Sequence, residues 1–181
     1  RLPLLTERRT RQFKLINIDR FFMHSEPVDA TSKYQDSLPV SSDDILEFLN
    51  ELDIEYRRFD HIALQTVEDS KKVQSQFLST DDGGGHIKNL FLRDHKKRNI
   101  LLVAEQDRNI DLKALPILLG TGRLSFGSAE RLLENLGVRP GAVTPLSMIN
   151  GVKTGVQLFL DNDLRKCKKL YVHPLVNDRT L

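Results

Sequence analysis

Apolar residues recur along this chain with two periods, one typical of helices and one typical of strands. From Ser42 onward they fall three and four positions apart, as at Ile45 and Leu49, which predicts an amphipathic helix that Ser42 caps. A second helix is predicted to begin at Thr66, because Asp69 follows three residues later and completes a typical N-terminal pair. Both starts offer side-chain oxygens to the unpaired amides of a helix N-terminus.

Short apolar runs separated by turn residues predict most of the remaining elements. The strongest pair is Ile87–Asp94 and Ile100–Glu105, which the charged residues between them join as a hairpin. Pro116 is expected to kink a helix. The other predicted elements are strands at 55–59, 156–160 and 170–172, helices at 111–119 and 129–136, and a helical turn at 162–166. Helices and strands do not alternate regularly, so we expect an α/β fold of the α+β type, with a mixed, largely antiparallel sheet flanked by helices.

The first forty residues differ in composition from the rest of the chain. Residues 1–20 hold six basic side chains, and residues 25–42 read as a loop. We therefore divide the chain into an N-terminal extension at 1–40 and one compact domain at 41–181. The chain begins with Arg1 instead of methionine, so we expect further residues upstream. A solvated extension is the favoured interpretation, and the remnant of an organellar targeting segment is the alternative.

Composition narrows the class of protein only modestly. A single cysteine, Cys167, rules out an internal disulfide and a cysteine-based metal cluster, and fits a reducing compartment. No apolar run approaches the ~20 residues that span a bilayer. The five histidines lack metal-site spacing, and the glycines at 83–85 lack the Lys-Ser/Thr of a phosphate-binding loop. We expect a cytoplasmic protein with no metal and no other cofactor; its net charge of +2 argues neither for nor against nucleic acid.

The stretch from Gly83 to Glu105, GGGHIKNLFLRDHKKRNILLVAE, is the most informative of the chain. Lys88 and Asn89 follow a flexible glycine entry and precede an apolar strand, so the strand can hold both polar groups against a cleft. A second such stretch, GRLSFGSAERLLENLGVRPGAVTPLSMIN, runs from Gly122 to Asn150.

Together with three shorter pieces, these stretches resemble the YbaK/ProX family of aminoacyl-tRNA editing domains, and in particular its freestanding ProXp-ala (PrdX) branch. The resemblance runs from about Ser42 to the C-terminus. Its pieces, in order, are TVE at 66–68, GGHIKNLFL at 84–92, DLKAL at 111–115, GRLSFGS at 122–128, GVRPGAVTP at 137–145 and VHPLVN at 172–177.

The resemblance implies a trans-editing hydrolase that deacylates alanyl-tRNA(Pro) and so keeps alanine out of proline codons. The implied partners are the alanylated acceptor end of tRNA(Pro) and, as a second candidate, prolyl-tRNA synthetase, with no role for DNA or a membrane. Two alternatives stay open. One is a cysteinyl-tRNA(Pro) deacylase of the YbaK type, and the other is a non-enzymatic module that holds tRNA or a synthetase.

The resemblance also suggests which residues form the site. Lys88 is the first catalytic candidate, because a compact cation can neutralise a terminal phosphate or polarise the ester carbonyl. The loop Gly141–Pro145 matches the family's G-x-x-x-P pattern. In it, the amides of Gly141 and Ala142 are catalytic candidates, and Val143, Thr144 and Pro145 are substrate-binding candidates. The structural alternatives are an exposed lysine at a strand edge and a plain connector between two elements.

His173 is the candidate general base, since histidine titrates near neutral pH. The alternatives are a purely structural histidine and activation of the water by the 2′-hydroxyl of the tRNA itself. Asn89 and Asn150 are candidates to orient water or the ribose, although asparagine near turns is commonly structural. The basic residues at 165–169 are most simply solvated, and contact with an acceptor stem is the alternative interpretation.

Overall fold

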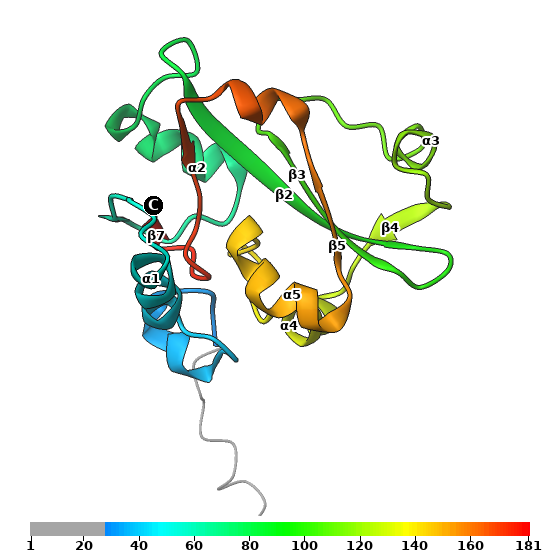
Figure 1. The fold of residues 1–181 in the computed structure, drawn as a ribbon, viewed down its shortest axis with the longest axis horizontal. Helices are drawn as coiled ribbons and strands as arrows, with labels where there is room; N and C mark the ends of the chain where they lie inside the picture. The colour runs from blue at the N-terminus through cyan, green and yellow to red at the C-terminus, as the bar shows by residue number, and fades with distance from the viewer. Residues whose placement is uncertain (1–27) are drawn as a thin grey trace, which may run out of the picture.

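The fold is seen in a computed structural model, which describes residues 28–181 (Figure 1). The arginine-rich stretch at 1–20 therefore lies outside the described residues. Residues 28–40, which composition assigned to the extension, pack against the domain and include a 3₁₀ helix at Ser32–Ser37. Ala30 is buried and accepts a hydrogen bond from the Asn177 amide at 2.9 Å. The Ser32 hydroxyl donates to the Asp178 carboxylate at 2.7 Å.

One long strand, β2 (Gly84–Asp94), organises the main sheet. It pairs antiparallel with β3 (Asn99–Glu105) and β4 (Leu124–Phe126), and its first residues pair parallel with β6 (Lys169–Tyr171). On the far side of β3 lies β5 (Gln157–Leu160), which is parallel to it. The strands β1 (Phe59–Asp60) and β7 (Arg179–Thr180) form a separate antiparallel pair. The expected mixed, largely antiparallel sheet flanked by helices is confirmed.

The two faces of the sheet carry separate apolar cores because side chains alternate along a strand. Phe91, Leu101 and Val103 face α4 (Ala129–Leu136) and α1 (Ser42–Glu51), with α5 (Met148–Thr154) beside α4. Leu92 and Leu102 face the opposite way, toward α3 (Leu115–Leu119), which lies at the β4 end of the sheet (Figure 1).

Helix starts agree closely with the capping signals. The α1 helix begins one residue earlier than predicted, because Ser41 instead of Ser42 is the N-cap and forms a reciprocal capping box with Asp44. Thr66 caps α2 (Val67–Val73) as predicted, accepting a hydrogen bond from the Asp69 amide at 3.1 Å. None of the helices within residues 28–181 is long and apolar enough to cross a bilayer.

Two predicted elements differ from the structure, and one helix was not predicted. The helix predicted at 111–119 spans only Leu115–Leu119, so Pro116 lies in its first turn, where its missing amide costs nothing and no kink results. The strand predicted at 55–59 is reduced to Phe59–Asp60. Residues 145–154 form a 3₁₀ turn at Pro145–Ser147 followed by α5, which places Asn150 inside a helix.

Candidate functional site

A small cavity of about 50 Å³ lies between α2, the start of β2 and the chain segment that follows β6. Asn89 lines it from β2, His173 from the segment after β6, and Val73 from α2. One water needs roughly 10–15 Å³ of such space, so the cavity has room for only a few waters or one small side chain. Two of the predicted site residues, Asn89 and His173, therefore line the same small cavity.

The His173 ring is held in one tautomer. Its Nδ1 lies 2.7 Å from the main-chain oxygen of Arg179. Because a carbonyl oxygen can only accept, Nδ1 carries the proton, and in the neutral ring Nε2 keeps its lone pair. Among residues 28–181, nothing forms a hydrogen bond with Nε2. The ring can therefore take a proton from a water in the cavity.

Burial lowers the pKa of His173 below its usual value of 6.5, because the imidazolium would be desolvated. The carbonyl of Arg179 opposes this shift in pKa, and the neighbouring His61 ring, with its centroid 6.2 Å away, reinforces it. The ring is consequently neutral at pH 7, which is the form a general base requires.

Asn89 lies on the same face of β2 as Phe91, one position from Lys88 but on the opposite side of the sheet. Its side-chain oxygen is buried and has no hydrogen-bond partner among the described residues. A buried amide oxygen without a partner can accept a hydrogen bond from a water or a substrate hydroxyl. Its position fits a role in orienting the attacking water.

Lys88 is not brought into the cavity that His173 and Asn89 line. Its ammonium donates to the main-chain oxygen of Arg108, in the turn after β3, and forms no ion pair within residues 28–181. The Arg108 guanidinium binds the carboxylates of Asp161 and Asp163, which fixes that turn. Lys88 therefore lies on the far face of the strand that carries Asn89, and its charge is among the causes that lower the pKa of the nearby Asp107 carboxylate.

The loop Gly141–Pro145 is built around a residue that must be glycine. Gly141 has a φ of +91°, and a Cβ there would lie 2.5 Å from Oε1 of Gln65 and 3.1 Å from Nδ2 of Asn177. The Ala142 amide, a candidate oxyanion donor, already donates to the Arg139 carbonyl at 3.0 Å.

The remaining predicted loop residues have structural contacts. Thr144 is fully buried and caps the 3₁₀ turn that Pro145 begins, and Val143 packs against the core. Asn150 donates to the Leu136 carbonyl at 3.4 Å and so ties α5 to the end of α4. Neither the loop nor Asn150 lines the small cavity.

The sequence profile of a family described as aminoacyl-tRNA editing domain matches residues 65–181, which include this cavity and the Gly141 loop. The chain belongs to that family. It is 35% identical over 138 residues to the prolyl-tRNA editing protein ProX of Acetoanaerobium sticklandii, covering 76% of this chain and 81% of the relative. A second relative, the prolyl-tRNA synthetase associated domain-containing protein 1 of Xenopus laevis, is 36% identical over 143 residues, with coverage of 76% and 82%.

The fold of this editing domain also matches solved structures. A crystal structure of a proposed trans-editing enzyme for prolyl tRNA synthetase superposes with a TM-score of 0.56, over 77% of this chain and 83% of the other. The sequence identity of that pair is 18%, so the likeness shows a shared fold.

Two residues that sequence reasoning did not select lie beside predicted site residues, Asn177 beside Gly141 and His61 beside His173. Asn177 is fully buried beside Gly141, and neither polar atom of its side chain has a partner among the described residues. The signal was present, because Asn177 closes the motif VHPLVN. His61 uses both ring nitrogens, with Nδ1 2.7 Å from the Ile62 carbonyl and Nε2 2.8 Å from the Thr180 hydroxyl. No sequence motif marks His61.

The described part of the editing domain holds no group of three His, Cys, Asp or Glu side chains arranged to bind a metal ion. Several polar side chains line the cavity, and among them the His173 imidazole and the Asn89 amide each present an atom without a partner among the described residues. The site can therefore hold a water, remove its proton and present it to a small electrophile.

Proposed function

We propose that this chain is a trans-editing aminoacyl-tRNA deacylase that hydrolyses the ester of alanyl-tRNA(Pro). Family membership and relatives named for prolyl-tRNA editing support the reaction class. The observation that carries the proposal is that a neutral His173, with Nδ1 fixed and Nε2 unpaired, shares a small cavity with Asn89. The partners are the alanylated acceptor end of tRNA(Pro) and, through it, prolyl-tRNA synthetase, in the cytoplasm.

In the proposed reaction, Asn89 orients a water and Nε2 of His173 accepts one of its protons. The water oxygen then bonds to the ester carbonyl carbon, giving a tetrahedral oxyanion. Collapse of this intermediate breaks the bond to the ribose oxygen, which takes the proton back from His173. The products are alanine and uncharged tRNA. An aminoacyl ester is already activated, so the chain need only position the water, remove its proton and stabilise the oxyanion.

The size of the cavity supports alanine as the preferred amino acid. A space for a few waters accommodates the methyl side chain of alanine. The proline side chain has two more methylenes and closes onto the backbone nitrogen as a pyrrolidine ring. A synthetase pocket gains only ~1–3 kcal/mol per methylene, so it cannot reject alanine strongly by binding alone. A second site that admits only the smaller residue supplies the missing discrimination.

We expect the protein to release alanine from alanyl-tRNA(Pro) much faster than proline from prolyl-tRNA(Pro). The test incubates the protein with alanyl-, cysteinyl- and prolyl-tRNA(Pro) and follows loss of the labelled amino acid. Faster loss of cysteine would assign the chain to the YbaK type, and faster loss of proline would contradict the size argument. Tight binding of all three without hydrolysis would identify a non-enzymatic module.

We also expect deacylation to need no metal ion, because neither the histidine spacing nor the side-chain grouping offers a ligand set. Dialysis against a strong chelator, followed by assay in metal-free buffer, should leave the rate of alanine release unchanged. A collapse that added zinc restores would contradict this expectation, and adding zinc to undialysed protein is the control for inhibition.

A further inference from the structure

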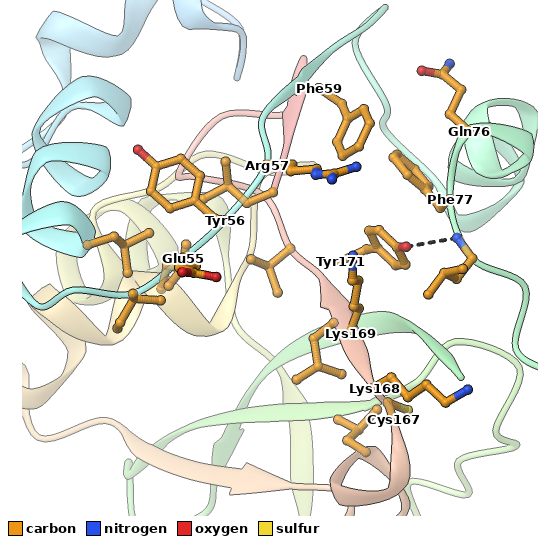
Figure 2. Close-up of a pocket in the computed structure, with 18 of the residues that line it drawn as sticks. Glu55, Tyr56, Arg57, Phe59, Gln76, Phe77, Cys167, Lys168, Lys169 and Tyr171 are labelled. Atoms are coloured by element: carbon orange, nitrogen blue, oxygen red, sulfur yellow. Dashed lines mark hydrogen bonds between the residues drawn. The ribbon is translucent and has the colours of Figure 1, made fainter. Parts of the chain in front are cut away.

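A second and much larger hollow, of about 1590 Å³, opens between the segment that precedes β1 and the strand β6. Figure 2 shows Tyr56, Arg57 and Phe59 on one side of this groove and Phe77 and Tyr171 on the other. The groove shares Phe77, Tyr171 and Val172 with the small cavity that holds His173. A ligand lying in the groove would therefore have one end at the candidate site.

Aromatic rings cluster along this shared wall. The rings of Phe77, His86 and Tyr171 form a triangle: the Tyr171 centroid lies 4.5 Å from that of Phe77 and 5.1 Å from that of His86, and the Phe77 and His86 centroids lie 6.2 Å apart. Phe59 meets Phe77 edge to face at 5.1 Å, and the Leu78 amide donates to the Tyr171 hydroxyl at 2.8 Å, which holds the cluster in place (Figure 2). Phe59, Phe77 and Tyr171 line the groove and are partly exposed, so their rings are the surface offered to a flat ligand.

The cations of the groove are not neutralised within the described residues. Arg57, Arg165, Lys168 and Lys169 line it, are exposed and form no ion pair in residues 28–181. Elsewhere, by contrast, Lys71, Lys72, Lys166 and several arginines are each bound to a carboxylate. The groove also holds two acidic residues, Asp53 and Glu55, so its lining carries an excess of positive charge.

We propose that this groove binds the single-stranded 3′ end of the RNA substrate, with phosphates at the Lys168 and Lys169 side and a base against Phe59. The inference rests on the proposed function, since it adds the path by which the substrate reaches the cavity. Unpaired cations along a groove with aromatic side chains are the combination that binds single-stranded nucleic acid. The shared wall then places the terminal ribose next to His173.

The test compares two double variants. Lys168→Ala/Lys169→Ala removes two groove cations, and Lys113→Ala/Lys153→Ala removes two exposed lysines that lie outside the groove and are likewise unpaired among the described residues. The probe is a fluorescently labelled RNA hairpin that has an unpaired 3′ end and carries no amino acid. The same hairpin with a blunt end is its control. We expect the groove variant to bind the overhanging hairpin roughly tenfold more weakly, with a salt slope smaller by about 0.7 per lost phosphate contact.

The matched variant should bind both hairpins like the unmodified protein, and Phe59→Leu should weaken binding of the overhanging hairpin alone. Equal affinities for the two double variants, or an equal loss for the blunt hairpin, would overturn the inference. Because the probe carries no ester, the result does not depend on hydrolysis. Groove-dependent binding in a protein that spares alanyl-tRNA(Pro) would refute only the proposed function. If the groove variant deacylates alanyl-tRNA(Pro) with an unchanged KM, only the proposal that the groove binds the RNA would be refuted.

Discussion

Replacing His173 by asparagine is expected to slow the deacylation of alanyl-tRNA(Pro) by about 10²–10⁴-fold, the usual contribution of a positioned general base. The asparagine amide can still donate to the Arg179 carbonyl, as Nδ1 of His173 does at 2.7 Å. The turn therefore keeps its hydrogen bond while Nε2 is lost. The measurement is single-turnover loss of alanine, with thermal melting as the check on folding.

The pH profile separates a base from a structural histidine. Burial lowers the pKa of His173 below 6.5, so the rate should be flat at neutral pH and fall on acidification, with a midpoint below 6.5. The His173→Asn variant should lack this fall. The lowered pKa of His173 also affects the stability of the fold. The unfolded chain protonates this histidine at a higher pH than the folded chain does. The stability that the neutral ring contributes is therefore complete above pH 6.5 and is lost as pH falls toward the lowered pKa.

His61→Asn is the matched control, because both nitrogens of the His61 ring already have partners. It should keep the rate within a few-fold of the unmodified protein. Since His61 helps to lower the pKa of His173, its removal should move the acidic midpoint upward. If His173→Asn retained near-normal turnover and the same pH profile, the activating group would be the 2′-hydroxyl of the substrate.

Local signals predicted the helix starts and the central hairpin, and contacts distant in sequence decided the rest of the fold. The pairing of β1 with β7 joins Phe59 to Thr180, and no local pattern indicates it. The helix α5 was missed because it contains Gly151, a residue that disfavours helices. The structure gives the reason for this glycine, since a Cβ there would lie 2.9 Å from Leu136 of α4. The close approach of two helices, not helix propensity, sets that position.

The candidate site was predictable in part. Motif resemblance selected His173 and Asn89, which line one cavity, and it also selected Lys88, which does not. The alternation of side chains along a strand already indicates that neighbours such as Lys88 and Asn89 face opposite sides. The positions of Asn177 and His61 depend on how the C-terminal segment packs against the residues that precede α2. There, the Leu64 amide donates to the Asn177 carbonyl at 2.8 Å. Only the folded chain brings those residues to the Gly141 loop and to His173.

Replacing Lys88 by alanine is expected to reduce deacylation by at least about 100-fold, if its ammonium neutralises a substrate phosphate or polarises the ester. In the free protein this ammonium donates to the Arg108 carbonyl and forms no ion pair among residues 28–181, although its charge helps to lower the pKa of Asp107. The proposal therefore requires that a substrate oxygen compete with that carbonyl for the ammonium, for which the flexible lysine stem provides reach. Lys88→Arg should also be slow, because a planar guanidinium cannot occupy the same point-charge position.

Lys71→Ala is the matched control for Lys88→Ala. Lys71 also contacts the turn after β3, binding Asp107 at 2.8 Å, but no substrate role is proposed for it. Its loss should leave turnover unchanged, and both variants should lose little stability, because an exposed polar contact is worth little against its competition with water. If Lys88→Ala keeps normal turnover and melts like Lys71→Ala, then Lys88 only anchors the turn at Arg108. The charge that stabilises the reaction would then have to come from the Gly141 loop, beside the unpaired amide of Asn177.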